Sequence, residues 1–189
     1  MRSPEAASEG VTPAKVKAYE ELWQRREHLE SRIRAAFADC RLGDGIGLLE
    51  ADAWDMCADP NKPREARERD ERQDWQSLSR ADLSWCNTAL CFTDAVGYRF
   101  LVPAFMLADL DGDIDEMIII HLSLTKKDPH GTRSQLNCAQ IEAIIEFLEL
   151  FLDDPDSRFH HPKITEALDA FWRPLLRNRK QEDEAEHRS

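Results

Sequence analysis

The spacing of apolar residues predicts helices over most of the chain. From residue 13 to residue 37, apolar side chains recur every three or four positions, the repeat of one helix face. The repeat is strongest over residues 138–153, where Asn137 and Gln140 form a capping-box pattern ahead of the apolar face. Further helices are expected over residues 48–57, 64–75, 79–90, 101–110 and 160–178, the last weakened by Pro174.

One segment favours a strand. Residues 117–124, MIIIHLSL, are rich in β-branched residues, which prefer strands. A single strand needs a partner, and residues 97–102, GYRFLV, are the best candidate. The predicted fold class is therefore α+β and predominantly helical, with about six or seven helices around a small two-stranded sheet or hairpin.

The chain has 189 residues, enough for one domain with its own core. We expect a disordered N-terminus over residues 1–12, a single globular domain over 13–177 and a disordered acidic tail over 178–189. No apolar run approaches the roughly 20 residues of a membrane span, and the first residues lack the apolar segment of a secretory signal. The expected location is the cytoplasm.

Charge narrows the classes of partner. The net charge is −12, and charged residues make up 33% of the chain without a basic stripe. Such a surface is repelled by the phosphates of nucleic acids and by anionic membranes. A basic protein is the expected partner, because opposite fields speed encounter.

The five cysteines are odd in number, and no pair has CxxC spacing. This pattern predicts reduced thiols, without a disulfide or a zinc site. We expect no metal and no cofactor. The cysteines are Cys40, Cys57, Cys86, Cys91 and Cys138.

The stretch DLDGDIDE, residues 109–116, resembles a calcium loop only at its start. Asp109, Asp111 and Asp113 match the first three ligand positions of an EF-hand. Ile114 stands where the loop needs glycine, and Ile120 where it needs a bidentate glutamate. We interpret the stretch as a solvated acidic turn on the partner-binding surface. The predicted contact residues are Asp109, Asp111, Asp113, Asp115 and Glu116.

Another set of charged residues permits a catalytic interpretation. Asp70 and Asp74 lie one turn apart on a predicted helix, and two close carboxylates can serve as general acid and base. Asp44 lies between two glycines, and Arg99 between apolar stretches. The structural interpretation is favoured: Asp44 caps a turn, and Arg99 forms an ion pair with Asp94 or a helix aspartate.

Large apolar and histidine side chains are assigned to the core. Trp54, Trp75 and Trp85 are expected to pack together, because large apolar side chains usually bury. His121 lies in the predicted strand and shares a face with Ser123. No GxSxG elbow accompanies this pair, so His121 is interpreted as a half-buried structural residue.

Three motifs carry a resemblance: LGDGIGLLEADAWD, RDERQDW and LCFTDAVGYRFLVPAFM. With these DGI, DxxxDW and GYRFLxPAFM-type patterns, residues 33–152 resemble an uncharacterised family of small bacterial proteins. The resemblance implies a bacterial source and a mostly helical fold with a small sheet. It implies no reaction.

These observations favour a non-catalytic bacterial protein that binds another protein through an acidic surface. A toxin-neutralising immunity protein is the concrete form of this hypothesis. The alternative is a small hydrolase or transferase that uses Asp44, Asp70, Asp74 and Arg99. A third hypothesis is a scaffold that self-assembles through the long first helix, and the oligomeric state stays open.

Overall fold

The computed structural model describes residues 13–56, 59, 61–112, 117–123, 128, 131–154 and 157–186. The stretch 1–12, for which disorder was predicted, lies outside these residues. The chain divides into two compact units, which are described separately. Unit 1 comprises Met1–Ala36, Leu122–Lys126 and Asn137–Ser189, and unit 2 comprises Phe37–His121 and Lys127–Leu136.

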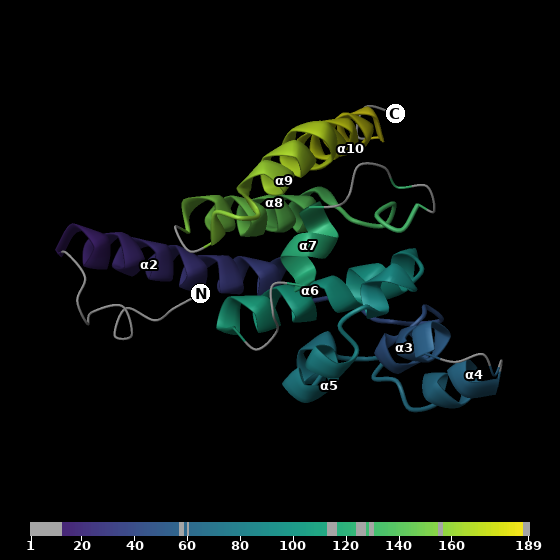
Figure 1. Cartoon of the computed structure of the whole chain (residues 1–189). Helices are drawn as coiled ribbons and strands as arrows, with labels where there is room; N and C mark the ends of the chain where they lie inside the picture. The colour runs from purple at the N-terminus through teal and green to yellow at the C-terminus, as the bar shows by residue number, and fades with distance from the viewer. Residues whose placement is uncertain are drawn as a thin grey trace. The chain divides into compact units, whose positions relative to one another are not determined.

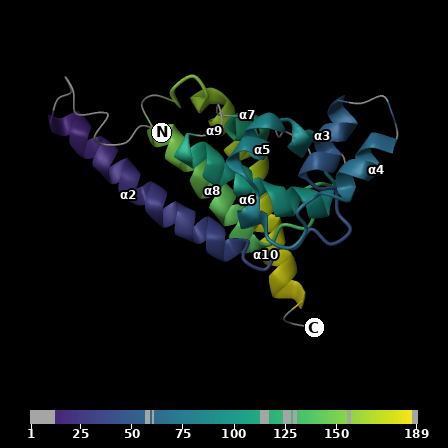
Figure 2. The same ribbon diagram turned by 90° about the horizontal axis from the view of Figure 1, so that it is seen from below.

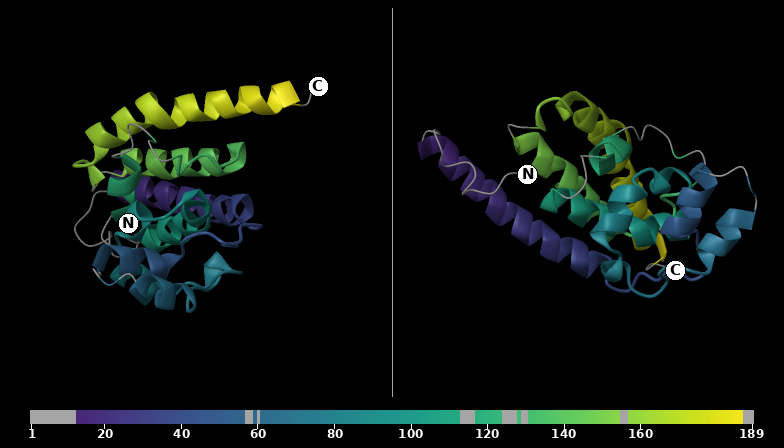
Figure 3. Two further views of the ribbon diagram at one scale, coloured as in Figure 1. Left: turned by 90° about the vertical axis from the view of Figure 1, so that its right-hand side faces the viewer. Right: turned by 60° about the horizontal axis from the view of Figure 1, so that its bottom comes forward.

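Unit 1 is built on helix α8. Helices α2 and α10 both pack against α8 (Figures 1 and 3). Helix α9 continues into α10 through a π-helical turn, η4. The bounds are Pro13–Ala36 for α2, Cys138–Asp153 for α8, His161–Ala167 for α9, Leu168–Trp172 for η4 and Arg173–Glu186 for α10.

The start of α8 follows from its sequence. Asn137 Oδ1 accepts a hydrogen bond from the Gln140 backbone N–H at 2.9 Å, and Gln140 Oε1 accepts one from the Asn137 N–H at 3.1 Å. This reciprocal pair confirms the predicted capping box. Gln140 Nε2 also donates to the carbonyl of Ala36 at 3.2 Å, which ties the end of α2 to the start of α8.

Unit 2 surrounds the buried helix α6. Elements η1, α5 and η2 contact α6, while α3 lies beside α4 and contacts η2 (Figure 2). The bounds are Leu48–Met56 for α3, Asn61–Arg67 for α4, Trp75–Ser77 for η1, Arg80–Trp85 for α5, Ala89–Cys91 for η2 and Ala95–Asp111 for α6. Helix α7, Met117–Ser123, belongs to unit 2 up to His121, and its last two residues belong to unit 1.

The predicted sheet is wrong: the described residues contain helices and no strand. Residues 117–123 form α7, and the proposed partner strand 97–102 lies inside α6. Ile118, Ile119 and Leu122 are fully buried, whereas Ile120 between them is less buried. This is helical spacing, so burial of one helix face overrides the strand preference of β-branched residues.

Helix α6 begins earlier than its apolar run implies. Asp94 caps it, because its carboxylate accepts from the Gly97 backbone N–H at 2.7 Å. Pro103 lies inside the helix and cannot donate to the carbonyl of Arg99 four residues earlier. The helix ends at Gly112, whose φ of 78° supplies the left-handed cap.

Helix α10 includes residues 178–186 of the stretch for which a disordered acidic tail was predicted. Residues 187–189 lie outside the described residues. Lys180 Nζ pairs with Glu142 of α8 at 2.7 Å, and Cys138 Sγ lies 3.2 Å from Asp183 Oδ2. These contacts attach the charged helix to α8.

Candidate functional site

Asp70, one of the proposed catalytic carboxylates, caps helix α3. It lies in a turn beyond the end of α4, where its carboxylate accepts from the backbone N–H groups of Leu49 at 2.7 Å and Glu50 at 3.2 Å. Burial raises its pKa, and the two backbone hydrogen bonds oppose the rise. A Cβ at Gly47 would lie 2.3 Å from the Asp70 carboxyl carbon, so glycine permits this approach.

Asp94 makes a second junction with the same loop. Its Oδ1 accepts from the Ile46 N–H at 3.2 Å as well as from Gly97. A Cβ at Gly97 would stand 2.0 Å from the carbonyl oxygen of Ile46. The motifs that begin at residues 42 and 90 therefore meet by direct backbone packing.

Two arginines hold the glycine-rich loop in place. Arg67 pairs with Glu50 at 2.7 Å and donates to the backbone carbonyl of Asp44 at 2.7 Å. Arg72 donates to the carbonyls of Gly43 and Gly45. The carbonyl of Asp44 thus enters the network, while the residue itself is exposed.

The four residues of the catalytic alternative do not come together. Asp74 is exposed and caps η1 by accepting from the Gln76 N–H at 3.0 Å. The predicted Arg99–Asp94 ion pair is not found among the described residues, and Arg99 Nε is buried without a hydrogen-bond partner there. Within the described chain, no hydrogen bond or ion pair joins any two of Asp44, Asp70, Asp74 and Arg99.

The structure describes residues 109–112 of the acidic stretch 109–116. Asp109 is 2% exposed in the last turn of α6, so it is not a surface residue. Asp111 is exposed and pairs with Arg80 of α5. The other predicted contact residues, Asp113, Asp115 and Glu116, lie outside the described residues.

A polar cluster in unit 2 contains a cysteine and a histidine. Cys91 Sγ lies 3.8 Å from His121 Nδ1, and Arg133 Nη2 lies 3.4 Å from His121 Nε2. The Arg133 guanidinium stacks 4.8 Å from the centre of the Tyr98 ring and pairs with Asp128 at 3.3 Å. Two helices and a loop thus place a thiol beside an imidazole.

This cluster does not activate the thiol. A guanidinium only donates, so His121 Nε2 accepts and the neutral ring keeps its proton on Nδ1, which faces Cys91. Burial and the charge of Arg133 lower the pKa of His121 to about 4. Partial burial and Asp55 raise the pKa of the Cys91 thiol, with Arg133 opposing. At neutral pH neither a thiolate nor an available base is present.

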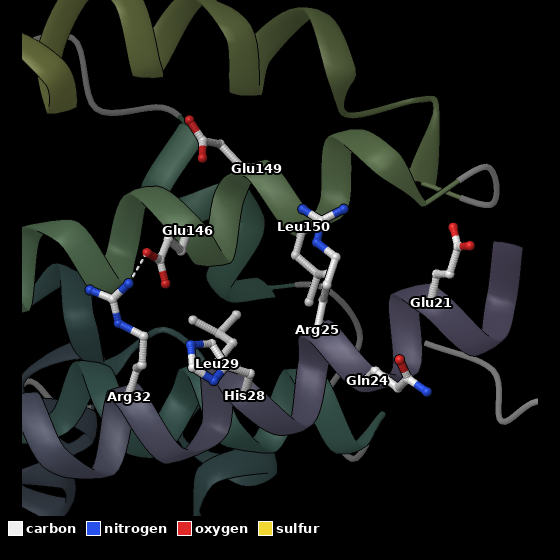
Figure 4. Close-up of a pocket in the computed structure, with 9 residues that line it drawn as sticks. All are labelled: Glu21, Gln24, Arg25, His28, Leu29, Arg32, Glu146, Glu149 and Leu150. Carbon is white, nitrogen blue, oxygen red and sulfur yellow. Dashed lines mark hydrogen bonds and ion pairs between the residues drawn. The ribbon is translucent and has the colours of Figure 1, made fainter.

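A groove of about 580 Å³ lies between α2 and α8 in unit 1 (Figure 4). Arg32 reaches across it to Glu146, and Arg25 pairs with Asp153 at 2.7 Å. Glu149 on the same face of α8 pairs with Arg173 of α10 at 2.9 Å. The carboxylates of α8 therefore form ion pairs with arginines of α2 and α10, and this groove contains an interhelical ion-pair network.

Unit 2 exposes large apolar side chains at the ends of two short helices. Trp54 and Met56 at the end of α3 are 50% and 67% exposed, and Trp85 at the end of α5 is 76% exposed. The prediction that Trp54, Trp75 and Trp85 pack together is wrong, because Trp75 alone of the three is buried. The acidic residues around Trp54 in EADAWDM were the signal of an exposed position.

Hydrogen bonds bring these two helix ends together. The hydroxyl of Thr88, just beyond α5, donates to Asp55 of α3 at 2.7 Å. The thiol of Cys86 hydrogen-bonds to Asp52. Burial, with Asp52 and Asp82 as the next causes, raises the pKa of Cys86 to about 12. Asp52 and Asp55 therefore lie next to Trp54 in α3 and contact the segment that follows Trp85.

Beside this junction, α3 and α4 enclose a second groove of about 590 Å³. Its lining has an apolar part, which we call the floor: Leu49, Ala53 and Met56 of α3 and Ala66 of α4. The charged part of the lining, which we call the rim, is Asp52, Lys62, Glu65, Glu68 and Arg69.

Over its described residues, the protein is all-helical. Helix caps and ion pairs connect its elements, and Trp54 and Trp85 are exposed. None of the helices described is long and apolar enough to cross a membrane. The chain belongs to the Family of unknown function (DUF6714), whose model matches residues 25–176. The match extends past both ends of the 33–152 span of the resemblance, further into α2 and through α9 into α10. No curated protein and no solved structure matches the chain.

Proposed function

We propose that this protein is a non-catalytic binding protein that takes a basic protein partner through unit 2. The observation that carries the proposal is the exposure of Trp54, Met56 and Trp85 at two joined helix ends. Tryptophan is among the residues that most often dominate binding energy, and methionine is enriched at interfaces.

Charge selects the kind of partner. Asp52 and Asp55 lie in α3 and Asp82 lies in the first turn of α5, and the chain as a whole carries a net charge of −12. A basic partner gains encounter rate from this field and can place a cation beside each carboxylate. The concrete form is a cytoplasmic bacterial immunity protein that neutralises a basic toxin.

The acidic stretch 109–116 has a smaller part in this proposal than the sequence implied. Asp109 is buried and Asp111 is paired with Arg80, so neither offers a free carboxylate. The catalytic alternative also has less support, because Asp44, Asp70 and Asp74 make separate structural contacts, and no hydrogen bond or ion pair among the described residues joins any of them to Arg99. We therefore place the proposed contact on α3 and α5.

A comparative pull-down tests the proposal. The full chain and its Trp54→Ser/Met56→Ser/Trp85→Ser variant serve as baits in lysate of the native host, with recovered proteins identified by mass spectrometry. We expect the wild-type bait to retain a basic protein that the triple variant loses. All three positions are exposed, so circular dichroism should show an unchanged helix content.

Phe159 supplies the matched control. It is 82% exposed in unit 1, so Phe159→Ser removes an equally accessible aromatic side chain elsewhere. This variant should retain the partner. Recovery of no partner by the wild-type chain, or equal loss in the Phe159→Ser variant, contradicts the proposal.

A further inference from the structure

We propose that the groove between α3 and α4 receives an amphipathic helix of the basic partner, with its apolar face on the groove floor and its lysine or arginine side chains at the rim. This inference rests on the proposed function and deepens it by naming the element that is recognised. The groove adjoins Met56, so it is continuous with the exposed end of α3.

The shape of the groove fits a helix. Two neighbouring helices form its walls, and the floor residues Leu49, Ala53 and Met56 recur at helical spacing along α3. Ala66 is the residue that α4 contributes to the floor, and its side chain is small. A third helix can insert a ridge of apolar side chains between two such helices.

The rim favours a cationic occupant. The rim has three carboxylates against two cations, and Lys62 pairs with Glu65 at 3.1 Å. Burial and the nearby charge of Asp55 raise the pKa of Asp52, so its ionised form is poorly stabilised in the free protein. An ammonium or guanidinium group beside Asp52 would offset the repulsion from Asp55 and stabilise the ionised carboxylate.

The methionines provide a direct readout. The sequence has four, of which Met56 is 67% exposed at the groove and Met106 is fully buried in α6. In the full chain labelled with ¹³C at the methionine methyl groups, the two signals are assigned with Met56→Leu and Met106→Leu. The probes are two helical peptides of about 15 residues that share one leucine pattern. One carries lysine and the other glutamate at the polar positions.

We expect the lysine peptide to shift the Met56 methyl signal saturably and to leave Met106 in place, and the glutamate peptide to shift neither. Ala53→Trp should fill the groove and weaken binding of the lysine peptide at least about tenfold. Ala81→Trp, on the exposed surface of α5, should leave binding unchanged. Glu68→Lys should weaken binding of the lysine peptide and strengthen binding of the glutamate peptide, a swap that misfolding cannot produce.

Three results would overturn the inference. The first is that the lysine peptide does not shift the Met56 methyl signal, and the second is that both peptides shift it equally. The third is a shift that rises with protein concentration alone, which would make a second copy of the chain the occupant. The proposed function is judged separately. Suppose that the Ala53→Trp variant still captures the partner, and that this capture depends on Trp54, Met56 and Trp85. The proposed function then stands and the groove inference fails.

Discussion

At the scale of single residues, several carboxylates act as hydrogen-bond acceptors for backbone N–H groups, among them Asp70 and Asp74 of the catalytic alternative. Asp70 caps α3 and Asp94 caps α6, and each also ties together segments far apart in sequence. The Asn137 cap could be predicted from sequence because its partner lies three residues away. The Asp70 cap could not, because 21 residues separate it from Leu49 and only the fold brings them together.

The close backbone packing at this junction predicts an unusually costly glycine substitution. Gly97→Ala should lower the free energy of unfolding by about 3 kcal/mol or more, because its Cβ meets a backbone oxygen that cannot move aside. Gly112→Ala should cost only about 1 kcal/mol, since its left-handed φ is strained but nothing lies within 4 Å. Urea unfolding measures both, and equal costs would refute the packing described.

His121 predicts a pH dependence with a definite sign. Its pKa is about 4 in the folded protein against 6.5 ordinarily, so the unfolded chain binds a proton first as pH falls. The free energy of unfolding should therefore fall between pH 6.5 and 4, by an amount on the order of 3 kcal/mol from this residue. The free energy of unfolding, measured by urea titration at several pH values, should change less steeply with pH in His121→Asn than in the wild-type chain.

His28 provides the comparison for this prediction. It is an exposed histidine of α2, so His28→Asn should keep the wild-type slope. If the free energy of unfolding depends on pH equally in His121→Asn and in the wild-type chain, the buried neutral imidazole is not the cause of the acid sensitivity.

At the scale of elements, the long periodic helices could be predicted from sequence and the short β-branched one could not. The strong apolar face of α8 indicates a helix in any context, and its cap marks where it begins. The run MIIIHLS is ambiguous, because four successive apolar residues satisfy a strand as well as a buried helix. Tertiary burial decides between them, and sequence periodicity does not contain that information.

Two isoleucines of α7 test this assignment. Ile119 is fully buried, so Ile119→Ala should cost about 2 to 4 kcal/mol in the free energy of unfolding. Ile120→Ala should cost clearly less, because Ile120 is only partly buried. Chemical denaturation gives both values. In a strand, Ile120 would share the face of Ile118 and Leu122 instead, so a larger cost at Ile120 would restore the strand.

At the scale of the whole molecule, average properties predict a kind of partner but not the position of a contact. Net charge predicts a basic partner wherever the site lies. The acidic stretch 109–116 was the most conspicuous candidate in the sequence, yet Asp109 is buried at the end of a helix. The exposed tryptophans were assigned to the core, because residue type alone predicts burial for most large apolar side chains.

The central claim is that exposed aromatic residues of unit 2 anchor a basic protein partner. The most direct measurement is the affinity of that purified partner for the wild-type chain, Trp85→Ala and Phe159→Ala by titration calorimetry. We predict that Trp85→Ala raises the Kd by about 30-fold or more, as for an interface hot spot, and that Phe159→Ala changes it less than about threefold. An unchanged Kd for Trp85→Ala, or a larger effect at Phe159, would contradict the account.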